Sequence, residues 1–298
     1  MFRVLIILLV LVVEIFGQRY LVHPYVERKK GLASSMVFDI EQDDFGRIWF
    51  ATRAGVSIYA GWKWYNPEIW KMGENEPQPQ VIKLYKDEKS VIWAVVGKNH
   101  EEIGYFNGFE YVKYSDIPKI NGYVAIYSLA VSKTPNGESK IYLATNYGIL
   151  ANIKKKWKVY NTNDGLISDS VYSIINKDGK VVFATPKGIG TLDDKGFNYS
   201  LNNLLPKDKK FIWGLNEDNS LSEKGTGKIW LVGKDWLGYI KNNRLTYVSS
   251  FTSSLLVTNN PISISSDNLN GIVFGNPAVV FHYSAAKKDV RTLTHANG

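Results

Sequence analysis

The stretch DDFGRIWFATRAGVSIY, Asp43 to Tyr59, places two turn signals and two apolar segments within seventeen residues. Asp and Gly residues ahead of the first segment are typical of a turn, because Asp side chains bond nearby backbone groups and Gly adopts dihedral angles that other residues avoid. In both segments β-branched and aromatic residues alternate with small or polar ones, which is the pattern of a strand. The stretch therefore predicts two strands joined by a second turn from Thr52 to Gly55.

The same phrase recurs along the chain at a regular spacing. The second turn reappears as TNYGIL at 145–150, TPKGIG at 185–190 and, less clearly, GKDWLG at 233–238. The positions that match Trp49 are Trp93, Tyr142, Val182, Trp230 and Val273. A period of about 45 residues is typical of the four-stranded blades of a propeller. Turn signals recur every eight to twelve residues, and no helical apolar face follows the first sixteen residues. We predict an all-β fold, a β-propeller of four-stranded blades with six blades visible.

The repeated phrase G-L-x-S … D-x-x-G-x-x-W-x-x-T-x-x-G also resembles a known family. The copies that start at Gly31 and at Asp164 match best, whereas the other four are degenerate. They resemble the two-component regulator propeller repeat, which forms extracytoplasmic sensor portions of hybrid histidine kinases and of some exported cyclase-type receptors. The resemblance covers roughly residues 18 to 298. It implies a ligand-sensing propeller, the N-terminal input portion of a signalling receptor, in which ligand binding alters packing against a second propeller. A kinase or cyclase output would then lie beyond residue 298, and this chain would not be an enzyme.

The N-terminal segment, residues 1–17, reads as a secretory signal peptide. It carries Arg3, an apolar run from Val4 to Val13 and a small residue, Gly17, where cleavage is expected. The alternative is an uncleaved membrane anchor, although the run is much shorter than the roughly twenty residues of a spanning helix. We therefore predict an exported protein, on the periplasmic or extracytoplasmic side of a bacterial cell, with the propeller over residues 18–298.

Composition excludes several kinds of site. The chain has no cysteine, so it holds neither a disulfide framework nor a thiolate metal site. The formal charge of +8 comes from lysines that are spread over different repeats. This distribution favours solvated turns over one surface for a polyanion, and we predict no nucleic-acid partner. The four histidines lie far apart with no metal-ligand spacing, and no Gly-rich phosphate loop is present. No catalytic residue, metal or cofactor is predicted.

The two ends of the chain predict an incomplete ring. VRTLTHANG, from Val290 to Gly298, is similar to the junction WKVYNTNDG before the fourth repeat. A further blade is therefore expected, which would make a seven-bladed ring. Gln18 to Val26 is rich in strand-forming residues and has no blade of its own. We predict that it supplies the outer strand of the missing blade, leaving a gap with uncovered apolar faces.

Geometry gives the candidate binding residues. In a propeller the turns between the second and third strands share one face of the disc with the loops that join the blades. The side chains expected there are Arg53, Lys98, Tyr123, Asn146, Tyr147, Asp169, Lys187, Asp235 and Trp236. Polar groups beside aromatic rings suit a carbohydrate or another small ligand.

A second hypothesis is an exported propeller enzyme, a polysaccharide lyase or glycosidase. It requires two carboxylates, or a Tyr or His base beside a cation, that converge near the axis. Asp169 and Asp235 come from neighbouring repeats and are the candidates for such a pair. A third possibility is a scaffold that binds other proteins through the same face of the disc.

Overall fold

The computed structural model describes residues 31–293 except 74–75, 98–101, 121–123, 134–136, 178, 219–227, 252–262, 267–270 and 277–278. Six sheets form, each of four antiparallel strands that pair in chain order. Blade by blade, the strands are β1 (Val37–Gln42), β2 (Ile48–Thr52), β3 (Gly55–Ala60) and β4 (Lys63–Tyr65); β5 (Val81–Lys86), β6 (Ile92–Val96), β7 (Glu102–Asn107) and β8 (Glu110–Asp116); β9 (Ile126–Lys133), β10 (Ser139–Thr145), β11 (Gly148–Ile153) and β12 (Lys156–Tyr160); β13 (Ser173–Lys177), β14 (Lys180–Thr185), β15 (Gly188–Asp193) and β16 (Gly196–Asn198); β17 (Ile212–Glu217), β18 (Ile229–Gly233), β19 (Trp236–Lys241) and β20 (Arg244–Ser250); β21 (Ser263–Ser266), β22 (Ile272–Asn276), β23 (Val279–Ser284) and β24 (Asp289–Leu293).

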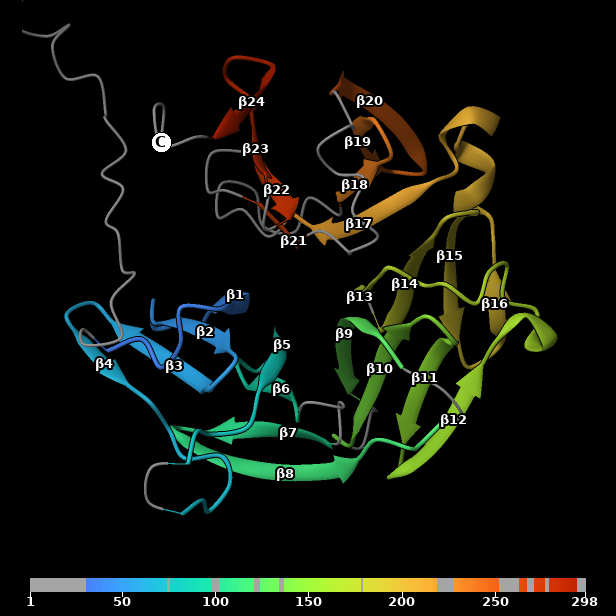
Figure 1. Ribbon diagram of the computed structural model, residues 1–298. Coiled ribbons are helices and arrows are strands. Elements are labelled where there is room, and N and C mark those ends of the chain that lie inside the picture. Colours follow the sequence, from blue (N-terminus) through green and yellow to red (C-terminus); the bar gives the residue numbers. More distant parts are fainter. Residues whose placement is uncertain are drawn as a thin grey trace, which may run out of the picture.

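The six blades are arranged around a common axis as a propeller (Figure 1). The first strand of each blade is the innermost, and each innermost strand contacts that of the next blade, from β1 through β21. Helical structure in the described residues is limited to the short 3₁₀ helices η2 (Thr162–Asp164), η3 (Leu201–Leu204) and η4 (Lys207–Lys209). The all-β prediction with six visible blades is therefore confirmed.

A buried carboxylate explains the Asp-to-Trp phrase. Asp43 Oδ1 accepts hydrogen bonds from the backbone N–H groups of Phe45 at 3.0 Å and Arg47 at 2.9 Å. Its other oxygen, Oδ2, accepts from the indole Nε1 of Trp49 at 2.8 Å. Gly46 has φ +76°, which closes the turn. The short-range pattern in the sequence thus fixes both the turn and the orientation of a core tryptophan.

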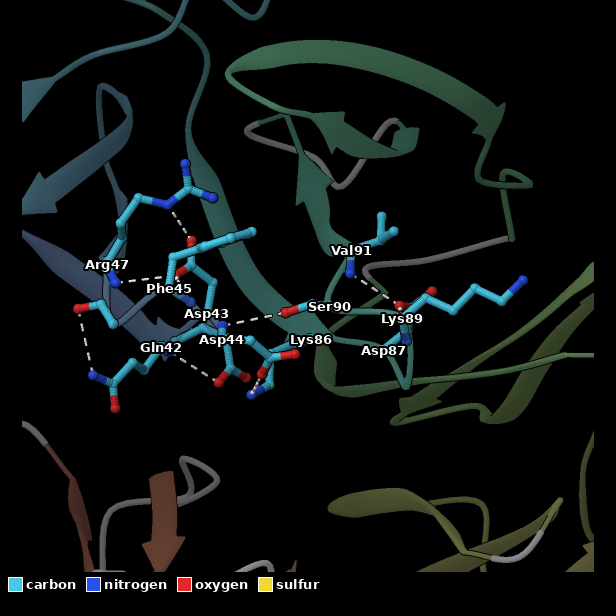
Figure 2. A network of polar contacts seen from close by, with 12 residues as sticks. Gln42, Asp43, Asp44, Phe45, Arg47, Lys86, Asp87, Lys89, Ser90 and Val91 are labelled. Carbon is cyan, nitrogen blue, oxygen red and sulfur yellow. Dashed lines mark hydrogen bonds and ion pairs between the residues drawn. The ribbon is translucent and has the colours of Figure 1, made fainter.

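In the second blade an aspartate bonds its own turn and a core tryptophan in the same way. Asp87 accepts from the backbone N–H groups of Lys89 and Val91 and from Trp93 Nε1 at 3.1 Å. Asp87 also forms an ion pair with Lys133 from β9 in the third blade, whose Nζ lies 3.2 Å from Asp87 Oδ2. The turns of the first two blades are also joined directly, since Lys86 Nζ lies 2.8 Å from Asp44 Oδ1 and Ser90 Oγ accepts from the Asp44 N–H (Figure 2).

The Thr-x-x-Gly turn has an equally local cause. Thr52 Oγ1 donates to the Gly55 carbonyl at 2.8 Å and accepts from the Ala54 N–H at 3.1 Å. Thr145 and Thr185 make the matching bonds in the third and fourth blades. All three Thr side chains are fully buried. A buried hydroxyl with both donor and acceptor roles satisfied holds the β2–β3 type of turn rigidly.

The core lies between consecutive blades. Five apolar clusters of described residues fill the five boundaries from the first blade to the sixth. Trp49, Trp93 and Trp230 are 1%, 2% and 1% exposed at matching places in their blades. The structure therefore confirms that these three positions of the sequence repeat are equivalent, and it places them between blades.

The segments 1–17 and Gln18–Val26 lie outside the described residues, so the predicted signal peptide and strand stay predictions. Within the described residues, no helix has the length and apolar character needed to cross a membrane.

Candidate functional site

One face of the disc collects the turns and loops predicted to form the site, and we call it the loop face. The start of β1 pairs with the end of β2, with Val37 opposite Thr52. The Arg53 N–H donates to the Met36 carbonyl at 3.1 Å, which ties the β2–β3 turn to the segment that enters the blade. In the third blade the Asn146 N–H bonds the Ala125 carbonyl in the same way. Turns and entering loops therefore do share a face.

The predicted residues on this face differ in how accessible they are. Arg53, Lys187, Asp169 and Asp235 are exposed, and Asn146 and Tyr147 are half-buried. All six lie in turns between the second and third strands of a blade or in a loop that joins two blades, and so on the loop face. Lys98 and Tyr123 lie outside the described residues.

Two of the predicted residues have structural roles in their own loops. Asn146 Oδ1 accepts the Ala125 N–H at 2.8 Å. Asp169 accepts hydrogen bonds from the N–H and the hydroxyl of Thr162, at 2.7 and 3.3 Å. The Asp169 bonds order the loop between the third and fourth blades, and the Asn146 bond holds the segment that enters the third blade. Asp169 is thus held within its own loop.

Trp236 does not reach the loop face, which corrects its assignment as a stacking residue. It is 1% exposed and belongs to the core cluster between the fourth and fifth blades. It stands at the position that Gly occupies in the matching turns, and its ring lies against Gly233, where a Cβ atom would be 1.9 Å from the indole Nε1. Burial in the core is more favourable for this large apolar ring than exposure to solvent in the turn.

An aromatic group near the axis was missed by the sequence reasoning. We call Tyr127, Tyr172, Phe211 and Trp213 the central aromatic cluster. Tyr127 and Tyr172 have ring centroids 5.6 Å apart, and Tyr172 stacks on Trp213 at 4.9 Å. Phe211 packs edge-on against Trp213 at 4.8 Å. The rings come from the third, fourth and fifth blades, so the cluster crosses two blade boundaries.

Local geometry aims these rings. The pairing register skips one residue near the start of β9 and of β17, and the skipped residues are Tyr127 and Trp213. Such β-bulges redirect a side chain away from the regular sheet faces. Tyr172 immediately precedes β13 and takes the matching place. The sequence signal that was available is an aromatic residue at one fixed position at the start of the inner strand, present also as Phe38 in the first blade.

The cluster combines accessible aromatic surface with a protonated hydroxyl. Tyr127, Tyr172 and Phe211 are half-buried, whereas Trp213 is 8% exposed. The Tyr172 hydroxyl is protonated at neutral pH, as in any tyrosine, and burial raises its pKa further above the ordinary value. Rings that are partly accessible and edged by polar loops can stack on an apolar ligand face and bond its polar groups.

Other hollows lie away from the loop face. A cleft of about 340 Å³ between the fourth and fifth blades is lined at one end by Lys177, Lys180, Asn242 and Asn243, from hairpin turns of the opposite face. Among the described residues, no group of three or more His, Asp or Glu side chains could hold a metal ion.

The fold and the repeated turn geometry define a β-propeller whose blades follow one sequence repeat. The model of the family called two component regulator propeller matches residues 31–54, which is the first copy of the repeat. The match confirms, for residues 31–54, the resemblance that the sequence phrase indicated. No curated protein sequence matches the chain.

Solved structures share the fold at low sequence identity. One is the extracellular domain of BT3049 from B. thetaiotaomicron, assigned as a hybrid two component system, with 18% identity, a TM-score of 0.58, and coverage of 88% of this chain and 34% of that chain. The extracellular domain of BT4673 from the same organism has 17% identity and a TM-score of 0.60, covering 87% and 33%. Virginiamycin B lyase from Staphylococcus aureus has 14% identity and a TM-score of 0.56, covering 87% and 84%. The chain thus spans about a third of the length of the first two.

Proposed function

We propose that this chain is an exported, ligand-sensing propeller, the input portion of a two-component signalling receptor, and that the loop face is its binding surface. The observation that carries the proposal is the family repeat at residues 31–54, whose Asp and Thr side chains build the turns of the first blade. The likeness to extracellular domains of two-component systems supports an extracytoplasmic location. The catalytic output would be supplied by other segments of the receptor.

The ligand that suits the loop face is a small carbohydrate. Sugar rings have an apolar face that stacks on aromatic side chains and a polar edge that needs hydrogen bonds. The central aromatic cluster supplies Tyr127 and Tyr172 for stacking. Exposed Arg53, Lys187 and Asp235 on the surrounding turns supply polar partners.

The structure also suggests how occupancy could be transmitted. The loop that carries Asp169 is tied to Thr162, and the Val171 N–H donates to the Thr145 carbonyl of the neighbouring blade at 2.9 Å. A ligand that contacts two such loops, and binds more tightly to one arrangement of the blades than to another, lowers the free energy of the arrangement that it prefers. A second propeller docked on this face would respond to that difference, because a ligand shifts an equilibrium only by its differential affinity.

Binding of a carbohydrate panel to the purified chain, followed by calorimetry, tests the proposal. Tyr172→Ala should weaken the affinity for the bound sugar by about tenfold or more, as expected for the loss of a stacking ring. Tyr247→Ala is the matched control, since Tyr247 is 48% exposed on the outer strand β20 of the fifth blade. Binding that is equally reduced by both changes, or insensitive to Tyr172, would contradict the loop-face assignment.

The enzyme hypothesis is tested on the same panel by measuring cleavage. The sensing proposal expects no turnover. Turnover that disappears in Asp169→Asn or Asp235→Asn, with sugar affinity retained, would replace sensing by catalysis at the loop face.

A further inference from the structure

Three blades share a group of one aspartate, one tryptophan and one cation, which we call the Asp–Trp–cation unit. In the first blade Asp43 accepts from the Trp49 indole, and the Arg47 guanidinium lies over that ring, 5.7 Å from its centroid. The same three groups occur in the second blade as Asp87, Trp93 and Lys133, and in the fifth blade as Asp218, Trp230 and Lys228. Each unit fills one end of a blade boundary with a buried ring beside a carboxylate and a cation.

The fourth blade lacks two members of this unit. Lys177 lies opposite Lys180 in the β13–β14 hairpin and so takes the aspartate position, because the aspartate and the cation of the first blade face each other in the same way. Val182 takes the tryptophan position. Lys180 therefore keeps the cation, whereas the ring and the aspartate are both replaced.

A hollow lies where the ring is missing. The fourth and fifth blades are neighbours (Figure 1), and the cleft of about 340 Å³ between them is lined by Val182 and, from the fifth blade, by Ile229 and Ile240. Ile240 is smaller than its counterpart Phe106, which packs on Trp49 with ring centroids 5.1 Å apart. Both side chains that meet at this place in the first boundary are thus smaller here. The volume lies in the range of small-molecule sites.

The rim of the cleft is polar and cationic. The polar side chains at one end are Lys177, Lys180, Asn242 and Asn243. Among the described residues that line the cleft, none is acidic. Lys177 pairs with Glu217 of the fifth blade at 2.7 Å. The Lys180 side chain is 61% exposed, and its ion pair with Asp193 is longer, at 3.8 Å. An exposed pair of this kind is weak, so Lys180 can turn towards an anion in the cleft at little cost.

We propose that this cleft binds a small aromatic carboxylate, whose ring takes the place of the missing tryptophan and whose carboxylate takes the place of the missing aspartate. Val182, Ile229 and Ile240 bury the ring. Lys180 pairs with the carboxylate and lies over the ring, as the cations do in the three complete units. This site is on the face opposite the loop face, so the proposal goes beyond carbohydrate sensing and does not depend on it.

The neighbouring boundary shows why the fourth blade is selected. A cleft of about 290 Å³ between the third and fourth blades also lies beside the tryptophan position, but Tyr142 already supplies a ring there. The two lysines that line this second cleft, Lys158 and Lys195, are matched by Asp193 and Asp194. Two carboxylates at the rim oppose the binding of an anion. We therefore expect an aromatic carboxylate to bind at the boundary of the fourth and fifth blades and not at this one.

Calorimetry of the full chain with indole-3-acetate tests the proposal. The expected Kd is below about 1 mM. Indole-3-acetamide, which has the ring without the charge, and acetate, which has the charge without the ring, should each bind at least about tenfold more weakly. Hydrogen exchange of the β14 and β18 amides should slow when indole-3-acetate is bound, because the ligand joins these two strands across the boundary.

Two substitutions separate the charge from the hollow. Lys180→Gln should weaken the binding of indole-3-acetate by about tenfold. Lys140→Gln is the matched control and should leave the affinity unchanged, since Lys140 takes the same position in the third blade and pairs with Asp194 at 2.9 Å. Val182→Trp restores the ring, so it should abolish binding and, by filling the hollow, raise the melting temperature by about 2–4 °C.

Three results would overturn the proposal. The first is no binding of indole-3-acetate, phenylacetate or 1-naphthoate at about 5 mM. The second is an equal loss of affinity in Lys180→Gln and Lys140→Gln, and the third is unchanged binding in a folded Val182→Trp variant. If Val182→Trp does not fold by circular dichroism, the comparison of the two lysine variants decides. Sugar binding that depends on Tyr172 is measured separately, so none of these results contradicts the loop-face assignment.

Discussion

Replacing the carboxylate of Asp43 by an amide should unfold the first blade selectively. Asp43→Asn keeps the size of the side chain, but an amide has only one acceptor oxygen. With that oxygen bonded to the backbone N–H groups of the turn, the indole N–H of Trp49 faces the amide nitrogen and has no acceptor. Trp49 is 1% exposed, so an unpaired indole N–H there costs about 1–3 kcal/mol. The partly exposed ion pair with Arg47 adds about 0.5–1 kcal/mol. The expected loss in the free energy of unfolding is therefore about 1.5–4 kcal/mol.

The neighbouring residue is the control. Asp44 carries the same group, but its side chain is 62% exposed and its carboxylate bonds Lys86 and nothing in the core. Asp44→Asn should cost less than about 1 kcal/mol. Urea unfolding gives the two free energies, and hydrogen exchange of the β2 amides locates the loss in the first blade. Equal losses for the two variants, within about 0.5 kcal/mol, would refute the view that Asp43 anchors Trp49.

The same pair of variants predicts a pH dependence. Burial acts to raise the pKa of Asp43, but the hydrogen bonds from Trp49 and Arg47 outweigh it, so the pKa lies below its ordinary value of 3.8. A carboxyl whose folded-state pKa is lowered contributes stability above its unfolded pKa and loses it as the pH falls through the folded value. The difference in stability between the natural protein and Asp43→Asn should be constant from pH 7 to about 5 and shrink below pH 4. A difference that stays constant to pH 2 would show that the charge of Asp43 is irrelevant.

Three further substitutions test the fold. Trp230→Ala should cost about 3–5 kcal/mol in urea unfolding, because it empties a buried position between the fifth and sixth blades; a loss below about 1 kcal/mol would place Trp230 outside the core. Gly148→Ala should lower the melting temperature strongly, since Gly148 has φ +105° and a Cβ would lie 2.0 Å from the Tyr160 carbonyl oxygen. Gly137→Ala is the control, because a Cβ there meets nothing within 4 Å and only the positive φ of Gly137 should lower the stability. Similar shifts in melting temperature for the two variants would argue against the close approach at Gly148. Thr185→Val should cost about 1–3 kcal/mol, because it removes the buried hydroxyl that bonds both sides of the turn, and an unchanged melting temperature would refute that role.

The sequence by itself determined the local units of this protein. The Asp43-to-Trp49 phrase and the Thr52-to-Gly55 turn involve bonds between residues at most six positions apart, so they can be read without knowing the rest of the chain. Alternation with period two then fixes which side chains share a face of each strand. Those two signals, repeated at about 45 residues, were enough to predict the blades and their order.

Only the tertiary structure decided what each face meets. Asp87 takes its cation from Lys133 in another blade, and Tyr172 stacks on Trp213 across a blade boundary. Trp236 has the sequence context of an exposed turn residue but lies in the core. Ile40 and Leu129 occupy equivalent positions in their repeats, yet one is 57% exposed and the other 3%. The physical reason is that burial depends on the neighbouring blade, which lies some forty residues away in sequence, whereas turns and strand periodicity depend on bonds within a few residues.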